Sequence, residues 1–248
     1  EDILLTALVV AITAWQHDLQ LKSGPILIDL ESHGRDAFDQ TMDLSQTLGW
    51  FTNMFPATFD ISTFDVSDML TGGRDIGRAL KSVKEQLRNI PSLADDTLQH
   101  AQNCRGLGYG LLRYANAQSR NTLATYDDAQ IGFNYLGRLS TGDTADWSPD
   151  LEVAHRLQMP QSKTSLLHLL DINVMTQVGE HHTQLIADWT WASDSVDHLA
   201  IKSLAFFWQQ ALESLVSHAE LATNKQLAKT LGIGGYTASD FPLVSINE

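Results

Sequence analysis

The feature that most constrains this 248-residue chain is an apolar run that ends abruptly in ionisable side chains. Residues 26–36 read ILIDLESHGRD, and the apolar residues of the first five positions are typical of a buried strand. Glu31, His33, Arg35 and Asp36 follow at the expected carboxyl end of that strand. A sheet fixes the backbone at such an end while side chains reach into a cleft beyond it. We therefore expect Glu31 to be a catalytic carboxylate.

Charge and hydropathy exclude several classes of partner. The net charge is −14, from 30 acidic and 16 basic residues, and such a surface repels nucleic acid and anionic membranes. No apolar run reaches the roughly 18 residues that span a bilayer. The longest candidate, Ile3–Trp15, is interrupted by Thr6 and Thr13 and lacks the basic flank of a signal peptide.

The cysteine count and the first residue bear on the setting of the chain. Cys104 is the single cysteine, so we expect no intrachain disulfide and no cysteine-based zinc site. A reducing cytoplasm is the simplest location. The chain begins at Glu1 without an initiator methionine, which indicates a piece of something longer.

Hydrophobic periodicity predicts an α/β layer structure around a mixed sheet. The pattern favours helices and strands in alternation, with glycine and proline between them. The expected elements are an amphipathic helix over 2–21, a strand over 26–30, an aromatic bend over 49–56, a helix over 75–90, a helix opening at 106–110, a strand over 129–139, a hairpin of 165–178 with 182–192, and a helix over 195–218.

Five stretches, taken in order, resemble the motifs of epimerization domains of nonribosomal peptide synthetases. Each alone is a weak signal, but together they cover nearly the whole chain. They are Asp2–Leu8 (DILLTAL), Glu31–Asp36 (ESHGRD), Gln46–Thr52 with Phe55-Pro56 (QTLGWFT, FP), Lys84–Pro91 followed by Gly106–Tyr114 (KEQLRNIP, GLGYGLLRY), and Phe133–Gly137 (FNYLG).

The resemblance implies a two-lobed fold like that of chloramphenicol acetyltransferase, with the active site between the lobes. This chain would be the C-terminal lobe, a mixed, largely antiparallel sheet flanked by helices over residues 1–221, with 222–248 as a linker towards a following module. The family's other catalytic motif, HHxxxDG, belongs to the N-terminal lobe. His181-His182 lacks that pattern, and we interpret it, like His168, as structural or solvated rather than metal-binding.

The implied activity is L/D epimerization at the Cα of an aminoacyl or peptidyl thioester. Such chemistry removes a weakly acidic proton and returns it to the opposite face, which two acid/base groups do most simply. By resemblance Glu31 is one of them, opposite the histidine of the absent lobe. Asn134 and Tyr135 match positions near that site, where the enolate oxygen needs hydrogen-bond donors. The sequence leaves open which group is base and which is acid.

We assign His33, Trp50, Gly108 and Tyr109 to a channel for the substrate and its phosphopantetheine arm. A loop-holding role is the alternative for His33, and a core position is the alternative for Trp50. No metal or other cofactor is expected on this chain, because the phosphopantetheine belongs to a peptidyl carrier protein. The other expected partners are the N-terminal lobe and neighbouring synthetase modules.

Several departures from the family pattern bear on this interpretation. Ser32 replaces a glycine, Asp36 a glutamate and Gln46 an arginine. An acidic insertion, Ser92–Arg105, separates motif halves that are nearly contiguous in the family. Two other functions therefore stay open: a condensation-type acyltransferase lobe, which would not need Glu31, and a non-catalytic docking lobe.

Overall fold

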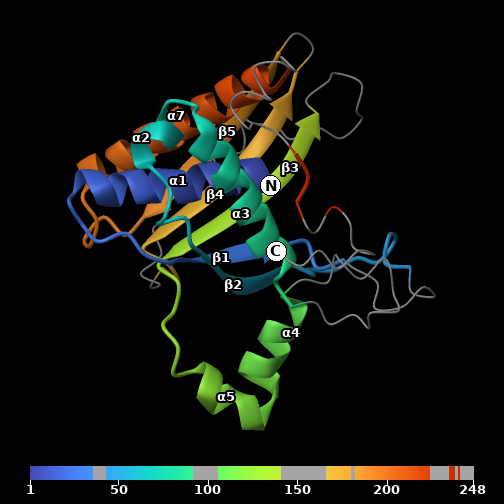
Figure 1. Ribbon diagram of the computed structural model, residues 1–248. Coiled ribbons are helices and arrows are strands. Elements are labelled where there is room, and N and C mark those ends of the chain that lie inside the picture. The colour runs from blue at the N-terminus through green and yellow to red at the C-terminus, as the bar shows by residue number, and fades with distance from the viewer. Residues whose placement is uncertain are drawn as a thin grey trace.

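The computed structural model describes residues 1–35, 43–91, 106–140, 166–179, 182–223, 235–237 and 240. Its centre is a five-stranded sheet in the order β2-β1-β3-β4-β5 (Figure 1). The strands are β1 Ile26–Ser32, β2 Asn53–Phe59, β3 Ile131–Ser140, β4 Leu170–Val178 and β5 Thr183–Trp191. The helices are α1 Asp2–Asp18, α2 Val66–Leu70, α3 Arg74–Arg88, α4 Leu107–Gly110, the π-helix η2 Leu111–Ala115, α5 Ala117–Leu123 and α7 His198–Thr223.

The sheet is mixed, as the sequence analysis expected. β1, β3 and β4 run parallel to one another, and β2 and β5 pair antiparallel at the two edges. Parallel and antiparallel pairings are thus equal in number, so the sheet is less antiparallel than expected. The edge position of β2 explains how it accommodates Pro56, because proline cannot donate a hydrogen bond to a second neighbouring strand.

One face of the sheet packs against helices to form the core. α1, α3 and α7 share this core with alternate strand residues such as Ile28, Leu30 and Ile172 (Figure 1). Every α1 residue from Leu4 to Ala14 is buried, so α1 is a central helix and not the amphipathic one that its 3.6-residue stripe suggested. Its neighbour α7 is tied to it by a hydrogen bond of 3.3 Å from Trp208 Nε1 to the Leu4 carbonyl.

The opposite face of the sheet is polar. Because strand side chains alternate between faces, the burial of Ile28 and Leu30 turns Asp29 and Glu31 to this side. The register places Asp29 beside Gly132 of β3, and Gly132 beside Asp171 of β4. We call this side, with Asp29, Glu31, Asn134, Asp171 and Asn173, the polar face.

Some expected elements were placed correctly and others were not. The strands over 26–30 and 129–139, the hairpin and the helices over 2–21, 75–90 and 195–218 are confirmed within a few residues. The expected bend over 49–56 instead leads into β2. The helix expected to open at 106–110 begins at Leu107, where α4 runs directly into η2, and it ends at Ala115, before α5. The apolar pattern of the last helix predicts that Leu199 faces inward, but Leu199 is 70% exposed.

The last helix and the residues after it lie at the C-terminal end of the described chain. α7 continues through Thr223, past the expected boundary at residue 221, and Asp240 beyond it accepts hydrogen bonds from Lys84 Nζ at 2.7 Å and Arg88 Nη1 at 3.2 Å. Whether residues 222–248 serve as a linker stays a prediction. Among the described helices, none combines the length and apolar character that crossing a membrane requires.

Candidate functional site

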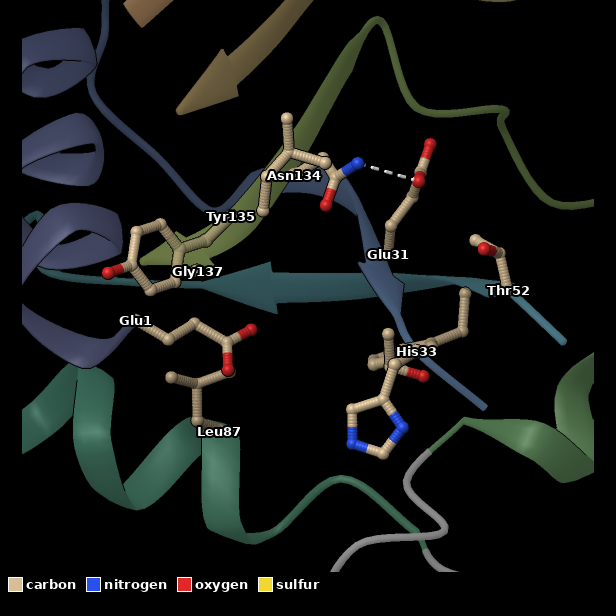
Figure 2. A pocket seen from close by; sticks show the side chains of 11 residues that line it. Glu1, Glu31, His33, Thr52, Leu87, Asn134, Tyr135 and Gly137 are labelled. Atoms are coloured by element: carbon tan, nitrogen blue, oxygen red, sulfur yellow. Dashed lines mark hydrogen bonds between the residues drawn. The ribbon is translucent and has the colours of Figure 1, made fainter. Parts of the chain in front are cut away.

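A cavity of about 550 Å³ lies at the carboxyl edge of the parallel strands β1 and β3. Figure 2 shows it from close by, with β1 and β3 bringing their side chains to its rim. Such an edge gathers the strand-end residues of neighbouring parallel strands at one place. The lining residues are Glu1, Glu31, Ser32, His33, Thr52, Phe55, Leu87, Asn134, Tyr135, Leu136 and Gly137.

Glu31 and Asn134 meet in this cavity across the junction of the two strands. The Asn134 Nδ2 amide donates a hydrogen bond of 2.9 Å to Glu31 Oε2 (Figure 2). Burial raises the pKa of Glu31 above its usual 4.5, and the negative charge of Asp171 raises it further while His168 lowers it. A carboxyl group whose pKa is moved towards neutrality is suited to both taking up and releasing a proton.

Tyr135 lines the same cavity from the other side. It follows Asn134 in β3, so its side chain turns to the helical face, where it packs partly against the core near Glu1 (Figure 2). Its phenol oxygen lies 3.1 Å from Thr176 Oγ1. The structure therefore brings Glu31 and Asn134 together and sets Tyr135 across the cavity from them.

The loop after β1 joins the cavity to a second segment of the chain. His33 is exposed, lines the cavity, and accepts a 3.0 Å hydrogen bond at Nδ1 from the Arg35 backbone. The Arg35 guanidinium donates to the carbonyls of Thr47 at 2.8 Å and Gly49 at 3.0 Å, and its Cζ lies 4.6 Å from the centre of the Phe51 ring. Arg35 thus holds the segment before β2.

Gly34 allows this loop to close. Its φ is +60°, a left-handed conformation that suits glycine, and a Cβ there would collide with the Phe51 carbonyl oxygen. Trp50, on the same segment, is 91% exposed and lines neither this cavity nor the next. The core position considered for Trp50 is wrong, because the Arg35 contacts fix the backbone of this segment on the surface.

A second cavity of about 410 Å³ adjoins the first, and Thr52 and Phe55 line both. Tyr109 lines this second cavity with Arg113 and Asp29, and burial raises the pKa of the Tyr109 phenol. Gly108 lies beside Tyr109 in α4. Of the expected channel residues, His33 therefore lies at the first cavity and Tyr109 at the second. Asp36, His181 and residues 92–105 lie outside the described residues.

Sequence reasoning interpreted His168 as structural or solvated and did not connect it with the polar face. His168, whose side chain is 2% exposed, lies between two carboxylates: Nε2 is 2.9 Å from Asp29 Oδ2, and Nδ1 is 2.7 Å from Asp171 Oδ1. The segment before β4 carries no motif that would have singled out this histidine. In the part of the chain that the structure describes, no set of three His, Cys, Asp or Glu side chains is arranged to hold a metal ion.

Comparisons with known proteins agree with the motif resemblance. No family model matches the chain. Chondramide synthase cmdD of Chondromyces crocatus is 32% identical over 249 residues, which are 100% of this chain and 5% of that protein. Tyrocidine synthase 2 of Brevibacillus parabrevis is 30% identical over 241 residues, which are 96% of this chain and 6% of the relative. The chain thus spans only a small part of the relatives that it matches.

Among solved structures, the epimerization domain from the third module of tyrocidine synthetase B superposes with a TM-score of 0.62. The sequences are 28% identical, and the match covers 88% of this chain and 41% of that domain. The resemblance inferred from the motifs is therefore confirmed. By sequence the chain is related to peptide synthetases, and by fold it corresponds to part of an epimerization domain.

Proposed function

We propose that this relative of synthetase epimerization domains is one lobe of such a domain. In this proposal Glu31 is one of two acid/base groups that interconvert L and D configurations at the Cα of an aminoacyl or peptidyl thioester on a carrier protein. The observation that carries the proposal is the Glu31 carboxylate, hydrogen-bonded by Asn134 at the cavity and with its pKa raised by burial.

The chemistry needs a proton to leave one face of Cα and return to the other. A carboxylate base takes the proton, the electrons of the C–H bond move into the thioester as an enolate, and an acid on the opposite side protonates Cα. A positioned acid or base contributes roughly 10²–10⁴-fold to such a step. The second group would be the histidine of an HHxxxDG motif in an N-terminal lobe, with Glu31 as base or acid according to the direction of reaction.

Asn134 and Tyr135 have distinct parts in this proposal. Asn134 holds one oxygen of Glu31 by its amide, which leaves the other oxygen for the substrate proton. Tyr135 lines the cavity from the opposite side and offers its phenol as a donor towards the enolate oxygen or towards Cα. A donor placed where negative charge develops stabilises the transition state more than the ground state.

The substrate arm would reach this site by way of the second cavity. The two cavities share Thr52 and Phe55 in their linings, which supports a continuous path past Tyr109 to His33. Gly108 lines neither cavity and precedes Tyr109 in α4. Trp50 would meet a partner only at the outer end, since its side chain is 91% exposed. Phosphopantetheine would be brought by the carrier protein, and neighbouring modules would complete the assembly.

The test is the Glu31→Gln substitution in a synthetase protein that carries both lobes. We expect epimerization of the carrier-bound residue to fall by about 10²–10⁴-fold, measured as the D/L ratio and as solvent deuterium incorporation at Cα. Glu213→Gln is a matched control, because it removes a carboxylate from α7, where Glu213 Oε1 accepts a bond from Gln209. Unchanged D/L ratios in Glu31→Gln would refute the proposal.

Two measurements separate the alternatives. A condensation-type acyltransferase lobe would form peptide bonds, so peptide-bond formation unaffected by Glu31→Gln, together with lost epimerization, argues against it. For the 248-residue chain alone we expect no turnover, because the second acid/base group is proposed to lie in another lobe. Racemisation by the isolated chain would contradict the two-lobed mechanism.

A further inference from the structure

His168 joins the three parallel strands on the polar face. It precedes β4, its ring nitrogens contact Asp29 of β1 and Asp171 of β4, and it passes over Gly132 of β3. A Cβ at Gly132 would lie 2.6 Å from His168 Nδ1 and would collide with Asp171 Oδ1. The absence of a side chain in the middle strand therefore makes room for this contact.

The contacts with Asp29 and Asp171 favour the charged form of the His168 imidazole. A carboxylate only accepts hydrogen bonds, so both ring nitrogens must carry protons to satisfy both partners, and the imidazole is then positively charged. Burial alone lowers the pKa of His168, but the hydrogen bonds to Asp29 and Asp171 outweigh it, and the pKa is raised above 6.5. With both carboxylates ionised and the imidazole protonated, the three side chains, which we call the His168 triad, carry a net charge of −1.

The His168 triad includes a residue of the same strand as Glu31. Asp29 is two residues before Glu31 in β1, so both side chains turn to the polar face. Within the described residues, the charges that act on Glu31 most strongly after its own burial are those of Asp171, which raises its pKa, and His168, which lowers it. Loss of the His168 proton would therefore leave Glu31 beside two uncompensated carboxylates.

Other described groups face the triad from its surroundings. Opposite Asp29 and Glu31, β2 presents Pro56 and Met54, and opposite Asp171, β5 presents Thr190, none of which is charged. Asp188 of β5 pairs with Asn173 further along the polar face. The ionisable groups that line the second cavity with Asp29 are Tyr109, Arg113, Tyr114, Asp127 and Asp128.

We infer that His168 is a positioning residue for proton transfer at Glu31: its charge, held between Asp29 and Asp171, sets the electrostatic environment in which Glu31 gains and loses its proton. The inference rests on the proposed function of Glu31. Asn134 contacts Glu31 directly. The triad instead acts on Glu31 through its net charge and through the alignment of β1 with β4.

The experiment follows the titration of the Glu31 carboxyl carbon by NMR in the ¹³C-glutamate-labelled chain, with the signal assigned by its loss in Glu31→Gln. His168→Gln changes the triad charge from −1 to −2, and we expect the Glu31 titration to move to higher pH. Asp171→Asn changes the charge to 0, and we expect a move to lower pH. The double variant restores −1 and should return the titration towards its original position.

In the synthetase protein that carries both lobes, the same substitutions should displace the pH profile of epimerization in the same directions. At a pH limited by the ionisation of Glu31, each single substitution should change kcat/KM by roughly three- to tenfold, since one pKa unit corresponds to a tenfold change. A purely structural role would lower kcat/KM in both single variants without displacing their profiles in opposite directions.

Titration of Glu31 at an unchanged pH in folded His168→Gln and Asp171→Asn would overturn the inference, even if Glu31→Gln is inactive. If His168→Gln does not fold, Asp29→Asn replaces it. Asp29→Asn and Asp171→Asn, each as a single substitution, must then shift the Glu31 titration to lower pH. If the triad variants displace the Glu31 titration but Glu31→Gln keeps full epimerization activity, the proposed function is overturned. The triad would then have no role in catalysis. The two failures are therefore distinguishable.

Discussion

Asn134 donates a 2.9 Å hydrogen bond to Glu31 from the neighbouring parallel strand. One oxygen of the carboxylate is thereby held, and the Glu31 side chain lines the cavity. A bond that favours the charged carboxylate opposes the effect of burial, which favours the neutral acid. The position of Glu31 thus depends on this amide, while its ionisation also depends on burial and on the charges of Asp171 and His168.

Removing that amide should weaken the proposed activity. A hydrogen bond to a charged group contributes about 1.5–3 kcal/mol, so Asn134→Leu should lower kcat/KM for epimerization by about 10- to 100-fold. It should also move the Glu31-dependent limb of the pH profile to higher pH. Asn173→Leu, at the paired position of β4, is the control. Equal losses in both variants would show that the polar face as a whole, and not this bond, was disturbed.

Glu31 should contribute to stability in a pH-dependent way. Its pKa in the folded chain is raised above 4.5, so its contribution is fully present below pH 4.5 and is lost as the pH rises through the folded value. Glu31→Gln should therefore gain stability relative to the original chain as the pH is raised above 4.5. Urea unfolding at a series of pH values measures this difference, and a difference that does not change with pH would contradict the raised pKa.

His168 should stabilise the fold mainly at lower pH. Its folded pKa is raised, so the stabilisation is fully present below pH 6.5 and is lost as the pH rises through the folded value. The destabilisation caused by His168→Gln should accordingly be largest below pH 6.5 and should shrink at alkaline pH. Thermal unfolding across a pH series from about 5 to about 9 would reveal it, and a loss of equal size at every pH would exclude a charged His168.

Gly132 should not tolerate a side chain. A methyl group there would collide with Asp171 and approach His168 Nδ1 to 2.6 Å, although the backbone is ordinary strand. Overpacking of this kind costs about 1–3 kcal/mol, so Gly132→Ala should lower the free energy of unfolding by that amount. Gly24→Ala has no atom within 4 Å of the new Cβ, and its effect should stay within about 0.5 kcal/mol. Similar effects in both variants would contradict the contact.

Arg35 should order the segment before β2. Its planar guanidinium reaches three backbone carbonyls, those of Leu44, Thr47 and Gly49, and lies over Phe51. Lysine cannot reproduce this forked geometry, so Arg35→Lys should speed proteolysis within 44–51 while global unfolding changes little. Limited proteolysis with mass spectrometry locates the cuts. Arg120→Lys is the control, since Arg120 donates to the Tyr114 carbonyl of a separate segment. Faster cleavage at 44–51 in the control would refute the assignment.

Local sequence determined much of the architecture. The apolar run 26–30 predicted a strand, and the alternation in 182–192 predicted a strand with one face towards a core. β1 and β5 confirm both strands, with Trp189 and Trp191 of β5 partly buried against the core. The hydrophobic periodicity of residues 2–21 did not reveal that α1 is buried on all sides, because the residues that surround a helix come from distant elements. β2 was missed because its start and Pro56 resemble a turn, and only pairing with β1 extends it.

Glu31 could be chosen from the sequence because a strand end and a family motif coincide there, and the sequence also brought Asn134 into consideration. The sequence did not determine that Asn134 and Tyr135, adjacent in the chain, approach the cavity from opposite sides, since the side on which a strand residue acts depends on what covers each face. Nor did it associate His168 with Asp29, which lies 139 residues away. The parallel order of β1, β3 and β4 brings these side chains together, and that order arises only when the helices bury one face of the sheet.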